Sequence, residues 1–276
     1  MTASDDQLLD RIRIDDSEAL EELLRRHAST VYRFGLRMCR NQADAEDVLQ
    51  ETLIAAARGI KAFRRESSVS TWLHTIARSF CIKKRRTSKF APTDVVSFDD
   101  RIALDAPTSE PAPDHAASDR ELSLLLEHAI DALDDTSREV LVLRDVEGLT
   151  APEVGEVLGL SVEAVKSRLH RARAAVRARV EAALPATERP SQFPAATGCP
   201  DIVSLFSRHL EGEIGAVDCD AMQAHLAKCR RCDAACGSLK RTLALCRSAP
   251  QGDVPAPIQA LVRQALRAFT LGTPAP

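Results

Sequence analysis

Residues 148–173 read GLTAPEVGEVLGLSVEAVKSRLHRAR, and the apolar spacing of this stretch decides how the chain folds. Thr150 and Glu153 have the spacing of a capping box at the start of a helix. Gly159 stands where this helix would end, because glycine readily adopts the left-handed conformation of a helix C-terminus. A second helical pattern begins near Ser161. The stretch is therefore predicted to form a helix, a short turn and a second helix.

The second of these helices is strongly basic. Residues 161–180 carry a net charge of +5, and their apolar positions would pack against the turn and the first helix. A helix–turn–helix unit places its second helix in the major groove of DNA, whereas a plain helical hairpin is the alternative. The predicted DNA contacts are Lys166, Ser167, Arg168, His170, Arg171 and Arg173, of which all but Arg168 are expected to point outward.

Charge is segregated along the 276 residues, although the formal net charge is only -3. Residues 61–90 carry a net charge of +8, while residues 91–118 carry -5. A uniformly basic nucleic-acid binder is excluded, but a chain with separate basic patches is not. Such patches neutralise phosphates and release counterions. The sequence therefore predicts two DNA-facing patches separated by acidic stretches.

Proline-containing breaks at residues 91–118 and 185–198 divide the chain into pieces at 1–90, 119–184 and 199–276. All three pieces show helical periodicity without strand-like alternation. The prediction is an all-α protein with two helical domains joined by an acidic linker, followed by a small helical C-terminal domain. Helices are expected at 16–39, at about 41–58 with Asn41 as N-cap, at 68–86, after capping boxes at Ser118–Glu121 and Thr136–Glu139, and at 257–271.

Aromatic residues are interleaved with the first basic patch. Phe63, Trp72 and Phe80 lie among its cations, and unpaired bases stack on such side chains. Trp72 and Phe80 could equally be ordinary core residues. The predicted DNA contacts in this patch are Arg64, Arg65, Trp72, Lys83, Lys84, Arg85 and Arg86.

Two long motifs resemble the extracytoplasmic-function (ECF) sigma factors of RNA polymerase. DAEDVLQET at 44–52, followed by FRRESSVSTWLHTIARSFCIKKRR at 63–86, resembles region 2, and residues 119–184 resemble region 4. The resemblance implies that residues 63–86 recognise and melt the -10 promoter element and that the basic helix reads the -35 element. It also implies docking on the clamp subunit of the polymerase through Asp44, Glu46, Asp47, Gln50 and Glu51.

Other functional classes have less support in the sequence. No nucleophile–base pair and no phosphate-binding glycine loop is recognisable, so no enzymatic activity is predicted. The acidic start of the chain lacks the apolar core of a signal peptide, and no apolar run is long enough to span a bilayer, so a cytoplasmic location without a membrane partner is expected. The alternative class, a regulator that binds DNA without the polymerase, does not account for the motif at 44–52.

Six of the eight cysteines fall within residues 199–246. Cys39 and Cys81 stand apart and are interpreted as small buried hydrophobic residues. Clustered thiols in a reducing compartment indicate metal or redox chemistry. Cys199, His225, Cys229 and Cys232 provide three thiolates and one imidazole, which is a standard tetrahedral zinc set. If residues 225–232 are helical, His225, Cys229 and Cys232 share one face.

This C-terminal piece resembles the zinc-binding anti-sigma domain, and its combination with a sigma factor resembles the CorE-type metal-dependent sigma factors. The resemblance implies control in cis by a transition metal (copper, zinc or cadmium), without a separate anti-sigma factor. A redox sensor and a structural docking module remain as alternatives. His209 is a further candidate ligand, and the predicted ligands are Cys199, Cys219, His225, Cys229, Cys232, Cys236 and Cys246.

Overall fold

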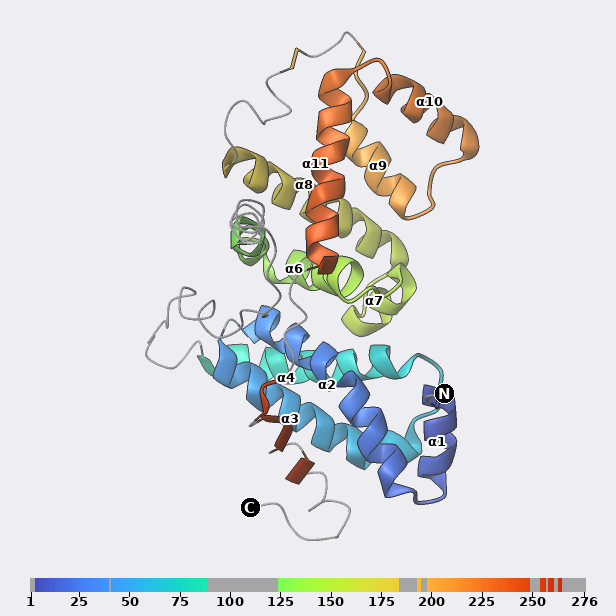
Figure 1. Ribbon diagram of the computed structural model, residues 1–276, viewed down its shortest axis with the longest axis vertical. Coiled ribbons are helices and arrows are strands. Elements are labelled where there is room, and N and C mark those ends of the chain that lie inside the picture. The colour runs from blue at the N-terminus through green and yellow to red at the C-terminus, as the bar shows by residue number, and fades with distance from the viewer. Residues whose placement is uncertain are drawn as a thin grey trace, which may run out of the picture. The chain divides into compact units, whose positions relative to one another are not determined.

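The computed structural model describes residues 3–39, 41–88, 124–183, 193–194 and 198–248, with 254–256, 258–260 and 263–264. Every regular element in these ranges is a helix (Figure 1), which confirms the predicted all-α fold. The chain forms two compact units. The first contains residues 3–88, with 156–159 and the described residues beyond 250, and the second contains residues 124–155 and 160–248. None of the described helices has the length and apolar character needed to cross a membrane.

The first unit is a helical bundle of α1 (Asp5–Arg13), α2 (Ser17–Cys39), α3 (Gln42–Gly59) and α4 (Val69–Ser88), with a short turn η1 (Ile60–Ala62) before α4. Leu23, Phe34 and Leu49 are among its fully buried side chains. The side chain of Asn41 accepts a hydrogen bond from the backbone N–H of Asp44 at 2.7 Å, so the predicted N-cap is confirmed. The helices expected at 16–39, 41–58 and 68–86 are likewise present.

Helix α1 was not predicted, although its N-terminus carries a recognisable signal. Ser4 and Gln7 form a reciprocal capping box, and Leu8, Leu9 and Ile12 are buried. The three apolar residues follow the i, i+1, i+4 spacing of one helix face. The capping pair and this short stripe could have indicated the helix.

The second unit begins with helical residues 124–131, followed by α6 (Asp135–Leu141), the π-helical turn η3 (Val142–Val146), α7 (Ala151–Leu158) and α8 (Val162–Ala183). The capping box of Thr150 and Glu153 is confirmed by reciprocal hydrogen bonds of 2.8 and 3.4 Å. The box expected at Thr136 is wrong, because Asp134 caps α6 by accepting from Ser137 N–H at 3.0 Å. Ser118–Glu121 lies outside the described residues.

The turn between α7 and α8 leaves no room for a side chain at Gly155. A Cβ atom there would lie 2.7 Å from the carbonyl oxygen of Leu160, and the Leu160 N–H donates back to the Gly155 carbonyl at 2.9 Å. The turn is therefore held by direct backbone contact. Both helices of the predicted helix–turn–helix are present, and this contact holds α7 against the turn that leads into α8.

We expect Gly155→Ala to lower the free energy of unfolding of the second unit by about 1–3 kcal/mol, because the added methyl must displace backbone. Urea unfolding followed by circular dichroism measures this loss. Gly237→Ala in α11 is the matched control, since a Cβ there meets only the end of Arg241 at 4.0 Å. The control should be neutral or stabilise by up to about 1 kcal/mol, and an equal loss in both variants would contradict the steric explanation.

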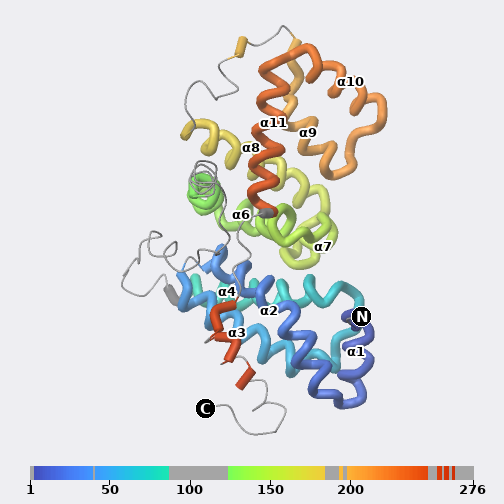
Figure 2. Tube along the Cα trace, viewed as in Figure 1, coloured from blue at the N-terminus to red at the C-terminus, as the bar shows by residue number. Residues whose placement is uncertain are grey.

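The C-terminal part of the second unit, called the tail below, consists of α9 (Ile202–Leu210), α10 (Ala216–Leu226) and α11 (Arg230–Ser248). Ile202, Phe206, Met222 and Leu239 form its apolar core together with buried cysteines. Helices α9 and α11 also pack against α8 (Figures 1 and 2). The helix expected at 257–271 lies largely outside the described residues.

Candidate metal centre and nucleic-acid interface

Four predicted metal ligands converge in the tail. Ligand atoms of Cys199, His225, Cys229 and Cys232 all lie within 4.8 Å of one another. Cys229 and Cys232 are buried, while Cys199 and His225 are half-buried. The sulfur atoms of Cys199 and Cys229 are 3.7 Å apart. This spacing allows one ion to contact all four groups.

The ligands converge at a junction between two helices, so the condition that residues 225–232 form one helix is not met. His225 lies in the last turn of α10, and Cys232 lies in the first turn of α11. Between them, the N–H groups of Lys228 and Cys229 both donate to the His225 carbonyl at 3.0 Å. Cys229 then begins the next helix by accepting from Asp233. Cys199 reaches the junction from the segment before α9.

The donor set fits a transition-metal ion. The Nε2 atom of His225 is buried and has no hydrogen-bond partner in the described structure, although buried polar atoms in folded proteins are normally satisfied. Burial, followed by hydrogen bonds with Cys199 and Cys229, raises the pKa of Cys232 to about 12. Three crowded thiols and an unsatisfied imidazole match the Cys₃His coordination of zinc.

Metal affinity should therefore depend steeply on pH. Thiolates are the ligands, so a cation must displace the thiol protons that the raised pKa retains. We expect the apparent affinity for Zn²⁺ to fall about tenfold or more per unit decrease in pH. Competition with a chromophoric chelator between about pH 6 and pH 8 measures this dependence. An affinity that does not change with pH would contradict thiolate ligation.

The other predicted ligands lie outside this group of four. Cys219 lies 3.7 Å from Nδ1 of His209 on the exposed side of the tail. Cys236 and Cys246 are buried on α11, and burial raises the pKa of Cys236. Ten residues of helix place these two roughly 15 Å apart, which is too far for one ion. Their role as ligands stays a prediction.

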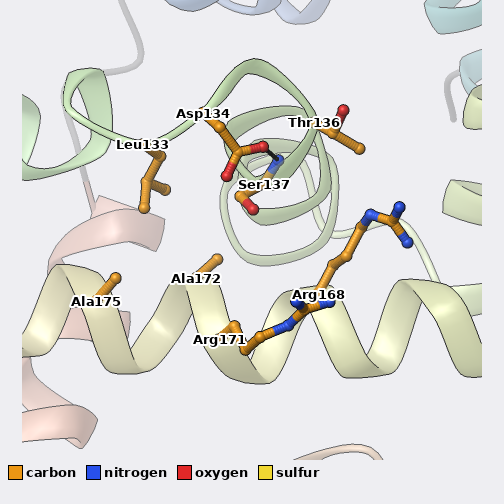
Figure 3. Close-up of a pocket in the computed structure, with 8 residues that line it drawn as sticks. All are labelled: Leu133, Asp134, Thr136, Ser137, Arg168, Arg171, Ala172 and Ala175. Atoms are coloured by element: carbon orange, nitrogen blue, oxygen red, sulfur yellow. Dashed lines mark hydrogen bonds between the residues drawn. The ribbon is translucent and has the colours of Figure 1, made fainter.

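Helix α8 distributes its predicted DNA contacts over different sides. Ser167 and Arg171 are exposed, while Lys166, Arg168 and His170 are half-buried. Arg168 and Arg171 line a pocket of about 370 Å³ opposite Asp134 and Ser137 of the α6 N-terminus (Figure 3). Both cations remain available to a ligand that approaches this side of α8.

Arg173 is the exception, and its expected outward position is wrong. Only 2% of the surface of Arg173 is exposed to solvent. The guanidinium donates to both carboxylate oxygens of Asp145 at 2.8 and 2.6 Å, and to Ser207 Oγ at 3.0 Å. It also donates to Glu211 at 2.9 Å. Arg173 therefore connects the helix–turn–helix to the tail.

In the first unit, several predicted DNA contacts form ion pairs with acidic residues. Arg65 donates to Asp10, and Lys84 forms an ion pair with Asp47. The hydrogen bond to Asp47 raises the pKa of Lys84. Trp72 is half-buried and stacks on Phe63, with ring centroids 4.9 Å apart. Arg64, Lys83 and Arg86 are exposed, and Arg85 is half-buried.

The predicted polymerase contacts share the outer side of α3. Asp47 and Gln50 are exposed, and Asp44, Glu46 and Glu51 are half-buried. The opposite side of the helix is buried through Ala45, Val48 and Leu49. Asp44 and Asp47 pair with Lys84 of α4, and the role of the five side chains in docking remains a prediction.

The structure also brings Cys39 and Cys81 together. Both are buried, as expected of small hydrophobic residues, and their sulfur atoms lie 3.4 Å apart. They belong to α2 and α4, which are separated by a whole helix in the sequence. Their spacing carries no local signal, so this contact could not be predicted.

Comparison with known families matches three parts of the chain. The Sigma-70 region 2 family matches residues 23–90, the Sigma-70 region 4 family matches residues 123–176, and a zinc-finger family matches residues 199–232. The first two matches include all the predicted DNA contacts of both patches. The third ends on Cys232 and includes all four ligands of the cluster.

Individual relatives agree with these matches. The ECF RNA polymerase sigma factor SigE of Mycolicibacterium smegmatis is 35% identical over 57% of this chain and 60% of its own length. SigM of Mycobacterium tuberculosis is 32% identical over 62% of this chain and 82% of its own length. SigW of Bacillus subtilis is 31% identical over 60% of this chain and 91% of its own length. The solved structure of CnrH in complex with the cytosolic domain of CnrY is similar to 64% of this chain and 97% of its own, with 26% identity and a TM-score of 0.47.

Proposed function

This chain belongs to the ECF RNA polymerase sigma factors, which act in transcription initiation, and from this we propose that it directs core polymerase to promoters under the control of a metal bound to its own tail. In this proposal the acidic side of α3 docks on the polymerase. Residues 63–86 recognise and melt the -10 element, and α8 reads the -35 element. Sigma factors are transcription regulators and not enzymes, and the site of action is the cytoplasm.

The observation that carries metal control is the place of the Cys₃His cluster. It lies in the same compact unit as the helix–turn–helix, because α9 and α11 pack against α8. A conformational change in the tail would therefore alter the packing of the helix that is proposed to read the promoter. No second chain is needed for such control, so the proposal includes no separate anti-sigma factor.

Cys199, His225, Cys229 and Cys232 would hold the ion, which supplies a cross-link between the start of α9 and the α10–α11 junction. Copper, zinc and cadmium suit this sulfur-rich donor set. In the proposal the tail covers promoter or polymerase surfaces without the right metal, and metal binding releases them. Cys219, Cys236 and Cys246 provide further thiols that could respond to a second ion.

Run-off transcription with purified core polymerase, titrated with each metal, tests this function. We expect activity that depends on one metal class and a response that is lost in the Cys229→Ser/Cys232→Ser variant. Cys39→Ser is the control, because it removes a buried thiol from the first unit outside residues 63–86. Transcription that does not respond to metal in any variant would overturn metal control. Failure to bind core polymerase would overturn the sigma function.

A further inference from the structure

Helix α9 ends in a fixed turn that projects two carboxylates. Gly212 has a φ of +68°, and its N–H donates to the His209 carbonyl at 3.0 Å. The next N–H, that of Glu213, donates to the Arg208 carbonyl at 2.9 Å. These two bonds form a Schellman motif, which favours glycine at its left-handed position. Residues 211–213, called the acidic turn below, therefore hold Glu211 and Glu213 in a defined geometry.

Both carboxylates bind cations of the helix–turn–helix. Glu211 is 4% exposed at its side chain and contacts Arg144 at 3.0 Å as well as Arg173 at 2.9 Å. Glu213 lies 3.0 Å from Nζ of Lys166, with 29% and 27% of their side chains exposed. The acidic turn thus pairs with cations on η3 and at two positions of α8.

The two α8 cations share one side of the helix. Lys166 and Arg173 are seven residues apart, which is close to two turns. Lys166 lies in the part of α8 that would enter a DNA groove, where phosphates would approach such a side chain. The carboxylate of Glu213 therefore takes the position of an anion that DNA would otherwise provide.

Arg173 and Lys166 differ in the partners that they keep when the acidic turn undocks. Arg173 keeps its bidentate contact with Asp145, which lies on η3 and not in the tail. Lys166 loses the Glu213 carboxylate, and Arg144 loses the Glu211 carboxylate while keeping its 3.2 Å hydrogen bond to the Leu149 carbonyl. Lys166 is thus the cation that undocking exposes most directly.

We propose that the acidic turn is an intramolecular competitor of DNA, which neutralises Lys166 and Arg144 when docked and frees them for the phosphates of duplex DNA when released. The proposal rests on the proposed role of α8 as a DNA-reading helix. Cys199 precedes the start of α9 and the acidic turn follows its end. The same short helix therefore links the metal centre to the competitor.

Binding of the full-length chain to a fluorescein-labelled DNA duplex of mixed sequence, followed by anisotropy, tests the competition. We expect Glu211→Gln/Glu213→Gln to bind more tightly than the native chain. The slope of log affinity against log salt should steepen by about one for each freed cation. The matched control is Asp218→Asn/Asp220→Asn, which removes the same charge from exposed positions of α10.

Lys166→Gln added to the Glu211→Gln/Glu213→Gln variant should remove most of the gain. The single variant Glu213→Gln keeps the Arg173 network and provides the same test if the double variant unfolds. An unchanged affinity and salt slope overturns the proposal, and so does an equal gain in the α10 control. The assay uses the zinc-loaded chain and contains no polymerase, so an inactive sigma factor in run-off transcription would overturn the proposed function separately.

Discussion

Replacement of Cys232 by serine is expected to unfold the tail while the first unit stays folded. Cys229 and Cys232 are both proposed ligands and members of the buried cluster that holds α9, α10 and α11 together. Structural zinc contributes an apparent binding free energy of about 10–16 kcal/mol, which is folding free energy when the site forms only in the folded state. A small helical tail has too little apolar core to replace that contribution.

Hydrogen exchange of the zinc-loaded chain measures this effect directly. Amides of residues 202–248 should lose protection in Cys232→Ser, whereas those of α2 and α3 should not. Cys219→Ser is the control, because Cys219 lies outside the four-ligand group. Retained protection of α11 in the Cys232 variant would show that the tail folds without the ion.

Arg173→Met should be the most destabilising change within the ion-pair network. It leaves Asp145 and Glu211, with side chains 1% and 4% exposed, without their shared cation. Removal of one partner of a buried pair costs about 3–5 kcal/mol, because the remaining charge is left buried. Here Asp145 loses its bidentate partner, while Glu211 keeps Arg144 at 3.0 Å. Arg173→Lys should not restore the loss, since an ammonium cannot reproduce the bidentate contact with Asp145.

Urea unfolding of the second unit measures the loss, and Arg171→Met provides the comparison. Arg171 is an exposed cation two residues earlier on α8, so its replacement should change stability by less than about 0.5 kcal/mol. Adding Asp145→Asn and Glu211→Gln to Arg173→Met should recover part of the loss. Equal stability of the Arg173 and Arg171 variants would mean that water compensates the buried carboxylates.

Much of the helical architecture was predictable because it depends on local features. The apolar periodicity of α2, the Asn41 cap of α3 and the Thr150–Glu153 capping box are all contained within a few turns of chain. The helix boundaries differ from the local pattern where neighbouring residues offer competing capping or helix-ending signals. Asp134 caps α6 in place of Thr136, and a helix boundary falls between His225 and Cys232, because backbone hydrogen bonds there close one helix and open the next.

The grouping of Cys199, His225, Cys229 and Cys232 as candidate ligands was predictable from residue types and spacing, since coordination chemistry acts locally. The order of the sigma-factor regions was implied by the resemblance to a known family. The partners of Arg173 and Lys166 were not predictable in either way. Asp145 lies 28 residues from Arg173, and Glu211 lies 38 residues from it, so no periodicity connects them. A cation on a basic helix has the same local pattern whether it faces DNA or a carboxylate. Its role is set by long-range packing, which here places the acidic turn of the tail against the predicted promoter-reading helix.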